Sequence, residues 1–200
     1  MLESILNIIL PMRCAMCKTH LSGSERGICS KCLNNLKPIS EGNILHFGKY
    51  QGGLEKAVRA LKFAEARAVA KPLGQRLGAA TREATWSFDA VIPIPLHGSR
   101  VRHRGYNQAE LLAQAVALEL GVPCMLALQR TRATKQQARL ERSERLKNLE
   151  DAFAVQQPVA GLEVLLIDDV HTSGSTLTEA SLCLIEAGAK RVRLAVLARA

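Results

Sequence analysis

The segment 164-VLLIDDVHTSGST-176 decides the expected fold of this chain. Its first four residues, 164–167, are aliphatic, which is typical of a strand covered on both faces in a parallel sheet. Asp168 and Asp169 follow at the expected carboxyl end of this strand. A polar loop then leads directly into a helix-like run over 177–188. The segment therefore predicts a buried strand, a polar loop and a helix in immediate succession.

The loop after the two aspartates is expected to bind an anion. Backbone N–H groups at a helix start, hydroxyl donors and a flexible glycine together form such a site. The residues that would form it are Thr172, Ser173, Gly174, Ser175 and Thr176. Two neighbouring carboxylates would repel the same anion, so the ligand should carry hydroxyls at one end and a phosphate at the other. An ordinary strand-to-helix turn also uses Asp, Ser, Thr and Gly, but it requires neither paired carboxylates nor this run of hydroxyls.

A ribose 5-phosphate group has this layout, with its 2- and 3-hydroxyls on Asp168 and Asp169 and its phosphate in the loop. Over nearly all of its thirteen positions, the segment resembles the phosphoribosyl pyrophosphate (PRPP) motif of type I phosphoribosyltransferases. The exception is His171, which stands where that family usually has an aliphatic residue. The resemblance implies an α/β fold, a parallel sheet flanked by helices, and binding of PRPP together with Mg²⁺.

Length, composition and charge bound the class of protein. The chain has 200 residues, of which 48% are apolar and 22% charged, enough for one full core and a small appendage. The apolar stretch 5–11 is too short to span a membrane and has no basic flank, so we expect a cytoplasmic protein without membrane insertion. The net charge of +9 favours an anionic ligand, and the aromatic content of 4% argues against a platform for stacking single-stranded bases.

Four of the six cysteines form two C-x-x-C pairs separated by eleven residues: Cys14, Cys17, Cys29 and Cys32. This spacing is typical of a structural Zn²⁺ site with four thiolate ligands and no open position. An iron centre or a disulfide is the remaining alternative. So short a segment cannot build a sizeable core, and the metal would stabilise its fold. We therefore expect a zinc-binding module over 1–38 and a phosphoribosyltransferase-like domain over 39–200.

After residue 38 the pattern predicts strands alternating with helices, as in a parallel sheet that binds ligands at its carboxyl edge. The expected strands are 44–50, 89–95, 123–128, 162–168 and 191–198. The expected helices are 54–84, 106–120 and 177–188. Gly52 and Gly53 are expected to form a turn, and Pro72 with Gly74 is expected to divide the first helical tract in two.

A second strand-to-helix connection, over 96–105, is strongly basic because it contains Arg100, Arg102 and Arg104. Type I phosphoribosyltransferases place their pyrophosphate-contacting loop here, and arginine suits bidentate phosphate binding. In an extended segment these alternate arginines could not all point the same way, so at least one is expected to face solvent. Three following residues are further site candidates: Tyr106, Asn107 and Gln108. Asn107 also fits as a helix N-cap.

The hydrophilic segment 130–148 is long for a simple connection. One interpretation is a mobile lid, which in the resembling enzymes closes over PRPP and excludes water from the reacting ribosyl centre. The other is an exposed charged helix over 140–149, because charged and polar side chains recur there at helical spacing.

The whole chain resembles the ComF family, in which an N-terminal zinc finger is fused to a phosphoribosyltransferase-like domain. The resemblance rests on the zinc module, on 104-RGYNQAELL-112, on the spacing of Gln, Leu, Arg, Asn and Phe over 137–153, and on the PRPP motif. It implies a bacterial protein involved in taking up or using external DNA. The leading hypothesis is phosphoribosyl transfer with release of pyrophosphate.

Two alternatives stay open. The protein could be a non-catalytic PRPP sensor or scaffold in a DNA-uptake machine, binding single-stranded DNA or a DNA-translocase helicase. The middle of the chain, where residues 96–147 contain ten Lys or Arg against four Asp or Glu, could also bind nucleic acid directly, with an affinity that falls steeply with salt.

Overall fold

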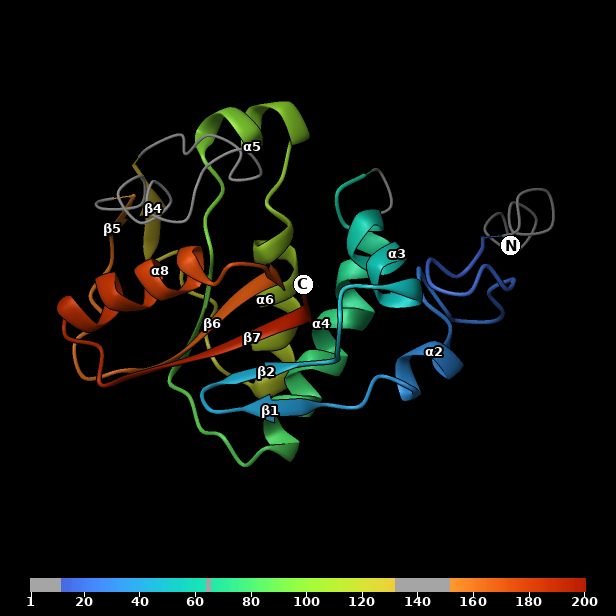
Figure 1. Cartoon of the computed structure of the whole chain (residues 1–200), viewed down its shortest axis with the longest axis horizontal. Coiled ribbons are helices and arrows are strands. Elements are labelled where there is room, and N and C mark those ends of the chain that lie inside the picture. The colour runs from blue at the N-terminus through green and yellow to red at the C-terminus, as the bar shows by residue number, and fades with distance from the viewer. Residues whose placement is uncertain (1–11, 64–65, 132–151) are drawn as a thin grey trace.

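A five-stranded sheet forms the centre of the protein, seen in a computed structural model that describes residues 12–63, 66–131 and 152–200 (Figure 1). Its strand order is β1-β2-β7-β6-β3. The strands are β1 (Ile39–Glu41), β2 (Ile44–His46), β7 (Arg191–Arg199), β6 (Glu163–His171) and β3 (Ala90–Pro93). The neighbouring pairs β2–β7, β7–β6 and β6–β3 are parallel, whereas β1 pairs antiparallel with β2. A separate antiparallel pair joins β4 (Leu128–Arg130) to β5 (Phe153–Val155).

Helices cover both faces of the sheet. The described helices are α2 (Ser30–Asn34), α3 (Gly52–Ala60), α4 (Ala66–Glu83), α5 (Gly98–Arg104), α6 (Gln108–Leu120) and α8 (Ser175–Glu186). Leu165 and Ile167 of β6 belong to the core formed with α4 and α6, whereas Val164 and Leu166 belong to the core formed with α8. Alternate residues of a strand face opposite sides, which explains why 164–167 are all apolar. The expected α/β fold with a largely parallel sheet is confirmed.

Helix α4 is continuous through Pro72, so the prediction that Pro72 and Gly74 divide this tract was wrong. The break falls earlier, between the end of α3 at Ala60 and the start of α4 at Ala66. Gly74 serves packing, because a Cβ there would lie 2.6 Å from the Cβ of Ala115 on α6. The cost of a proline inside the helix is therefore offset by tertiary contacts along α4.

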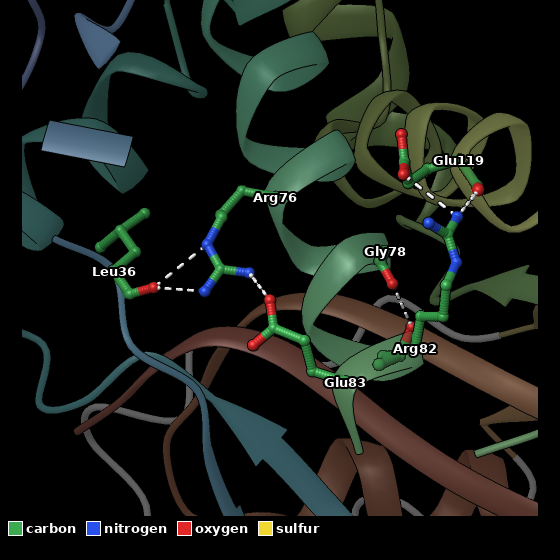
Figure 2. A network of polar contacts seen from close by, with 7 residues as sticks. Leu36, Arg76, Gly78, Arg82, Glu83 and Glu119 are labelled. Carbon is green, nitrogen blue, oxygen red and sulfur yellow. Dashed lines mark hydrogen bonds and ion pairs between the residues drawn. The ribbon is translucent and has the colours of Figure 1, made fainter. Parts of the chain in front are cut away.

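Polar contacts join α4 to α6 and to the segment between α2 and β1 (Figure 2). Arg76 donates hydrogen bonds from Nε and Nη2 to the carbonyl oxygen of Leu36, at 3.1 and 2.8 Å. Its Nη1 lies 3.0 Å from Oε1 of Glu83. Arg82, the penultimate residue of the same helix, pairs with Glu119 of α6. Since Leu36 lies between α2 and β1, Arg76 fixes the segment through which the chain enters the sheet at Ile39.

Three other local predictions need correction. The strand expected over 123–128 is reduced to a single parallel bridge between Cys124 and Val91, because the chain pairs there only through the amide of Met125 and the carbonyl of Pro123. Gly52 and Gly53 begin α3 instead of forming a separate turn, with Gly52 at φ +59°. The expected strand over 44–50 shortens to β2, which forms an unforeseen hairpin with β1.

The lid or charged helix expected over 130–148 falls almost wholly outside the described residues. Within the described ranges, none of the helices combines the length and the apolar character needed to cross a membrane.

Candidate functional site

The two aspartates lie near the carboxyl end of β6, which continues past them to His171. The backbone N–H of Asp169 donates a 2.8 Å hydrogen bond to Oδ1 of Asp168. Asp169 is buried, and Asp168 keeps some exposed surface although its carboxyl group is enclosed by protein atoms. Burial, and then the neighbouring charge of Asp169, raise the pKa of the Asp168 carboxyl well above its ordinary value. A carboxylate pair that is held in so unfavourable an environment is typical of a binding or catalytic site.

The hydroxyl-rich loop leads into α8, which begins at Ser175, two residues earlier than expected. Gly174 is the N-cap, with φ +78°, a conformation that glycine adopts without strain. A Cβ on Gly174 would also lie 2.8 Å from Nε2 of His171, so the imidazole packs directly against the loop. The hydroxyl oxygens of Ser173 and Ser175 are 2.8 Å apart. Thr172 to Gly174 therefore form a compact loop, and Ser175 and Thr176 begin the twelve-residue helix at the positive end of its dipole.

The basic segment is a helix, so the prediction of an extended loop was wrong. Helix α5 begins after His97, whose Nδ1 accepts a hydrogen bond from the Ser99 amide, and ends at Gly105 with φ +79°. Arg100 and Arg104 are one helical turn apart, whereas Arg102 lies on another side. The structure leaves Arg100 and Arg102 exposed. Arg104 is partly buried, and its Nη1 donates a 2.6 Å hydrogen bond to Oε1 of Gln108.

Gln108 connects the basic helix to the aspartate pair. Its Nε2 donates to Oδ2 of Asp169 at 3.4 Å, so Arg104, Gln108 and Asp169 form a continuous polar chain from α5 to β6. The Asn107 side chain is engaged in the backbone, because Oδ1 caps α6 through the Ala109 amide and Nδ2 donates to the Ile94 carbonyl. Asn107 thus positions the start of α6, as its N-cap pattern indicated.

Two further cations lie at this edge that sequence reasoning did not select. Nζ of Lys62 is 3.5 Å from Oδ2 of Asp169. Arg130, at the end of β4, stacks over the Phe153 ring, with its guanidinium carbon 5.4 Å from the centroid. Burial lowers the pKa of Arg130, as does the charge of Arg100, while Asp168 raises it. Neither residue belongs to a recognisable motif, and only the folded chain brings them to β6.

The four cysteines form one compact cluster, in which the Sγ atoms all lie within 4.8 Å of one another. Sγ of Cys17 and Sγ of Cys29 are 3.7 Å apart, close to the ~3.8 Å separation expected for two tetrahedral ligands ~2.3 Å from zinc. The side chain and backbone of Thr19 lower the pKa of Cys17 to about 6. The Cys29 amide donates to Sγ of Cys14 at 3.4 Å. The donor set fits structural Zn²⁺ with no position left for a substrate.

Comparison with family models identifies both parts of the chain. Residues 5–49 match the double zinc ribbon domain, and residues 106–200 match the phosphoribosyl transferase domain. Among solved structures, the chain is similar to glutamine PRPP amidotransferase from B. subtilis, with a TM-score of 0.50 and 20% identity. That match covers 72% of this chain and 30% of the other, and it supports the fold alone.

Curated relatives extend the match over nearly the whole chain. Competence protein F of Haemophilus influenzae is 31% identical over 222 residues, which cover 94% of this chain and 97% of that protein. DNA utilization protein YhgH of Salmonella typhimurium is 30% identical over 224 residues, with 96% and 99% covered. Competence protein ComFC of Bacillus subtilis is 39% identical over 99 residues, 49% of this chain and 39% of that protein. The zinc ribbon, the phosphoribosyltransferase fold and the two relatives matched over nearly their whole length together show that the chain belongs to the ComF family.

Proposed function

We propose that this protein binds PRPP at the carboxyl edge of β6 and transfers its phosphoribosyl group to an acceptor, with release of pyrophosphate. The observation that carries the proposal is the partly buried Asp168–Asp169 pair, immediately followed by a glycine-containing hydroxyl loop at the start of α8. Carboxylates bind ribose hydroxyls, and a helix N-terminus binds phosphate. Few ligands other than a phosphorylated sugar satisfy both groups at once.

The proposed roles follow from this layout. Asp168 and Asp169 accept hydrogen bonds from the ribose 2- and 3-hydroxyls, and Thr172 to Thr176 surround the 5-phosphate. The pyrophosphate lies toward α5, where Arg100, Arg102 and Arg104 supply positive charge. Mg²⁺ bound with PRPP would offset part of the substrate's negative charge and help the pyrophosphate to leave.

In the transfer step, the bond between C1 of the ribose and the pyrophosphate oxygen breaks, and that oxygen keeps the electron pair. A nucleophilic atom of the acceptor forms the new bond to C1, and its proton passes to the departing pyrophosphate or to water. Positive charge develops on the ribosyl ring, which the nearby carboxylates stabilise, while the arginines stabilise the departing anion. The burial that raises the pKa of Asp168 also strengthens these interactions, because it lowers the local dielectric.

The relatives named competence protein F and DNA utilization protein support a role for this activity in taking up or using DNA. We therefore propose that the acceptor or the partner belongs to DNA uptake or to the processing of the internalised strand.

Calorimetric titration with PRPP and Mg²⁺ tests the site. Wild type should bind one equivalent, and Asp168→Asn/Asp169→Asn should lose at least about a hundredfold in affinity, since each lost charged hydrogen bond costs ~1.5–3 kcal/mol. Glu186→Gln is the matched control, because Glu186 is an exposed acid at the end of α8. Failure of wild type to bind, or equal binding by the double variant, would exclude the proposed site.

Turnover is tested separately by measuring pyrophosphate release from PRPP in the presence of a panel of nucleobases, nucleosides and amines. Release that depends on one acceptor class supports the transferase. Tight binding without release from any acceptor would instead favour the sensor or scaffold.

A further inference from the structure

Lys62 lies in the turn between α3 and α4, far in sequence from the PRPP motif. Its Nζ is 3.5 Å from Oδ2 of Asp169, and 37% of its side chain is exposed, against 10% for Asp169. Because more than a third of the Lys62 side chain is exposed, solvent screens this ion pair. The Lys62 ammonium is therefore able to leave Asp169 for another anion when hydrogen bonds from a ligand replace it on the buried carboxylate.

Tyr106 holds the turn in place on both sides of Lys62. The Tyr106 hydroxyl is 3.0 Å from the carbonyl oxygen of Leu61 and 2.9 Å from that of Phe63. Because one hydroxyl proton is shared between these two acceptors, the backbone before and after Lys62 is fixed to the segment between α5 and α6. This arrangement directs Lys62 to the edge of the sheet that holds the aspartates.

The neighbours of Asp169 indicate which part of a ligand Lys62 would meet. Oδ2 of Asp169 also accepts from Gln108, whose Oε1 accepts from Arg104 of α5. Lys62 and Gln108 thus contact the same carboxylate oxygen, and Gln108 is in turn bound to Arg104 of the basic helix. The hydroxyl loop at 172–176 lies further along the polypeptide, beyond the end of β6.

We propose that Lys62 is a substrate-binding residue that pairs with Asp169 in the free protein and with a pyrophosphate oxygen of bound PRPP. The inference rests on the proposed function and deepens it. Ribose hydroxyls displace Lys62 from Asp169, and the released ammonium then binds the pyrophosphate beside Arg104. Tyr106 is a positioning residue, since it acts through the Leu61 and Phe63 carbonyls.

The test compares Lys62→Met with wild type, using PRPP, inorganic pyrophosphate and ribose 5-phosphate as three probes in the presence of Mg²⁺. Loss of one charged hydrogen bond should weaken PRPP and pyrophosphate about tenfold or more. The affinity of the variant for ribose 5-phosphate should stay within about twofold of the wild-type value. This ligand makes no contact with Lys62, and the solvent-screened ion pair that it displaces contributes little free energy. Lys56→Met is the matched control, because Lys56 is an exposed lysine on α3.

Tyr106→Phe keeps the ring and removes both hydrogen bonds to the turn. It should show the same selective loss as Lys62→Met, but a smaller one, which a general loss of folded protein would not produce.

Equal weakening of all three probes by Lys62→Met would overturn the proposal, since a lysine that only balances the charge of Asp169 gives that result. Unchanged PRPP binding would overturn it as well. In both cases wild type still binds PRPP and the proposed function stands. Absence of PRPP binding by wild type is a different outcome, in which the proposed function and this inference fail together.

Discussion

Gly27 of the zinc ribbon lies directly against the carbonyl group of Ala68 in α4. A Cβ at Gly27 would be 2.4 Å from that carbonyl oxygen and 2.6 Å from its carbon. In a regular helix the Ala68 oxygen would accept from the residue four positions on, but that residue is Pro72, which has no N–H. The proline therefore removes the i+4 donor of a helical carbonyl on the surface that the zinc ribbon covers.

Gly27→Ala should separate the zinc ribbon from α4. The added methyl group cannot fit against backbone atoms, and φ at Gly27 is +66°, so we expect a loss of ~2–4 kcal/mol in the free energy of unfolding. Denaturant unfolding measures this loss. Gly23→Ala is the control, because Gly23 has φ +58° and nothing within 4 Å. Equal losses in the two variants would mean that the contact with Ala68 contributes nothing.

Arg76→Met should weaken a second contact of α4, the one with the segment around Leu36. The variant keeps most of the side-chain volume but removes both hydrogen bonds to the Leu36 carbonyl, leaving that buried residue unpaired at this contact (Figure 2). Expected destabilisation is ~1.5–3 kcal/mol in thermal or denaturant unfolding. Arg59→Met removes only an exposed ion pair with Glu55 and should cost less than ~0.5 kcal/mol. Similar values for both variants would contradict the structural role of Arg76.

Cys32→Ser should remove the bound metal. Wild type purified without chelator is expected to hold about one equivalent of Zn²⁺, measured by elemental analysis. The variant has three of the four clustered thiols and should retain little zinc and unfold at a lower temperature, because metal binding stabilises this small module. Cys124→Ser changes a cysteine outside the cluster and should keep a full equivalent. Full zinc content in Cys32→Ser would contradict a four-thiolate site.

Asp168→Asn should stabilise the protein near pH 7 while it weakens PRPP binding. Because the pKa of Asp168 is raised on folding, the folded state binds its proton more tightly than the unfolded state does. The free energy of unfolding therefore falls as pH rises above the ordinary Asp pKa of ~3.9. When melting temperatures are measured from pH 4 to 8, the variant should melt above wild type at neutral pH, and this difference should disappear toward pH 4.

Glu163→Gln should change the stability at neutral pH in the opposite direction and serves as the comparison. A hydrogen bond from Lys190 lowers the pKa of Glu163, so its contribution is present at neutral pH and is lost as pH falls through its folded-state value. This variant should melt below wild type at pH 7, and the difference should shrink in acid. A loss of stability at pH 7 in Asp168→Asn, like that of Glu163→Gln, would contradict the raised pKa.

Features that are specified by short contiguous motifs could be predicted from the sequence. The run 164–167 specified a strand buried on both faces, and β6 with its two flanking cores confirms it. The paired C-x-x-C spacing specified the cysteine cluster, because a zinc knuckle is built from neighbouring residues. Asn107 was recognisable as an N-cap, since capping depends on the next few amides only.

Two local predictions failed, one because of tertiary packing and one because of helix caps that the pattern did not reveal. Pro72 and Gly74 are breakers in an isolated helix, yet α4 continues through both because it packs between α6 and the zinc ribbon. The basic segment was expected to be extended, but a His97 cap and a left-handed Gly105 enclose two turns of helix. That change decides which arginine reaches Gln108.

The sequence by itself thus determined the family, the zinc ligands and the strand that ends in two aspartates, because each is specified by short motifs that can be recognised in the sequence. Only the tertiary structure decided what surrounds those aspartates. Gln108 is 61 positions from Asp169, and Tyr106 is 45 from Leu61, so no local pattern links them. The packing of α3, α5 and α6 around the edge of the sheet brings Lys62 and Gln108 to the same carboxylate, with Arg104 bound to Gln108, and this happens only when the whole core is formed.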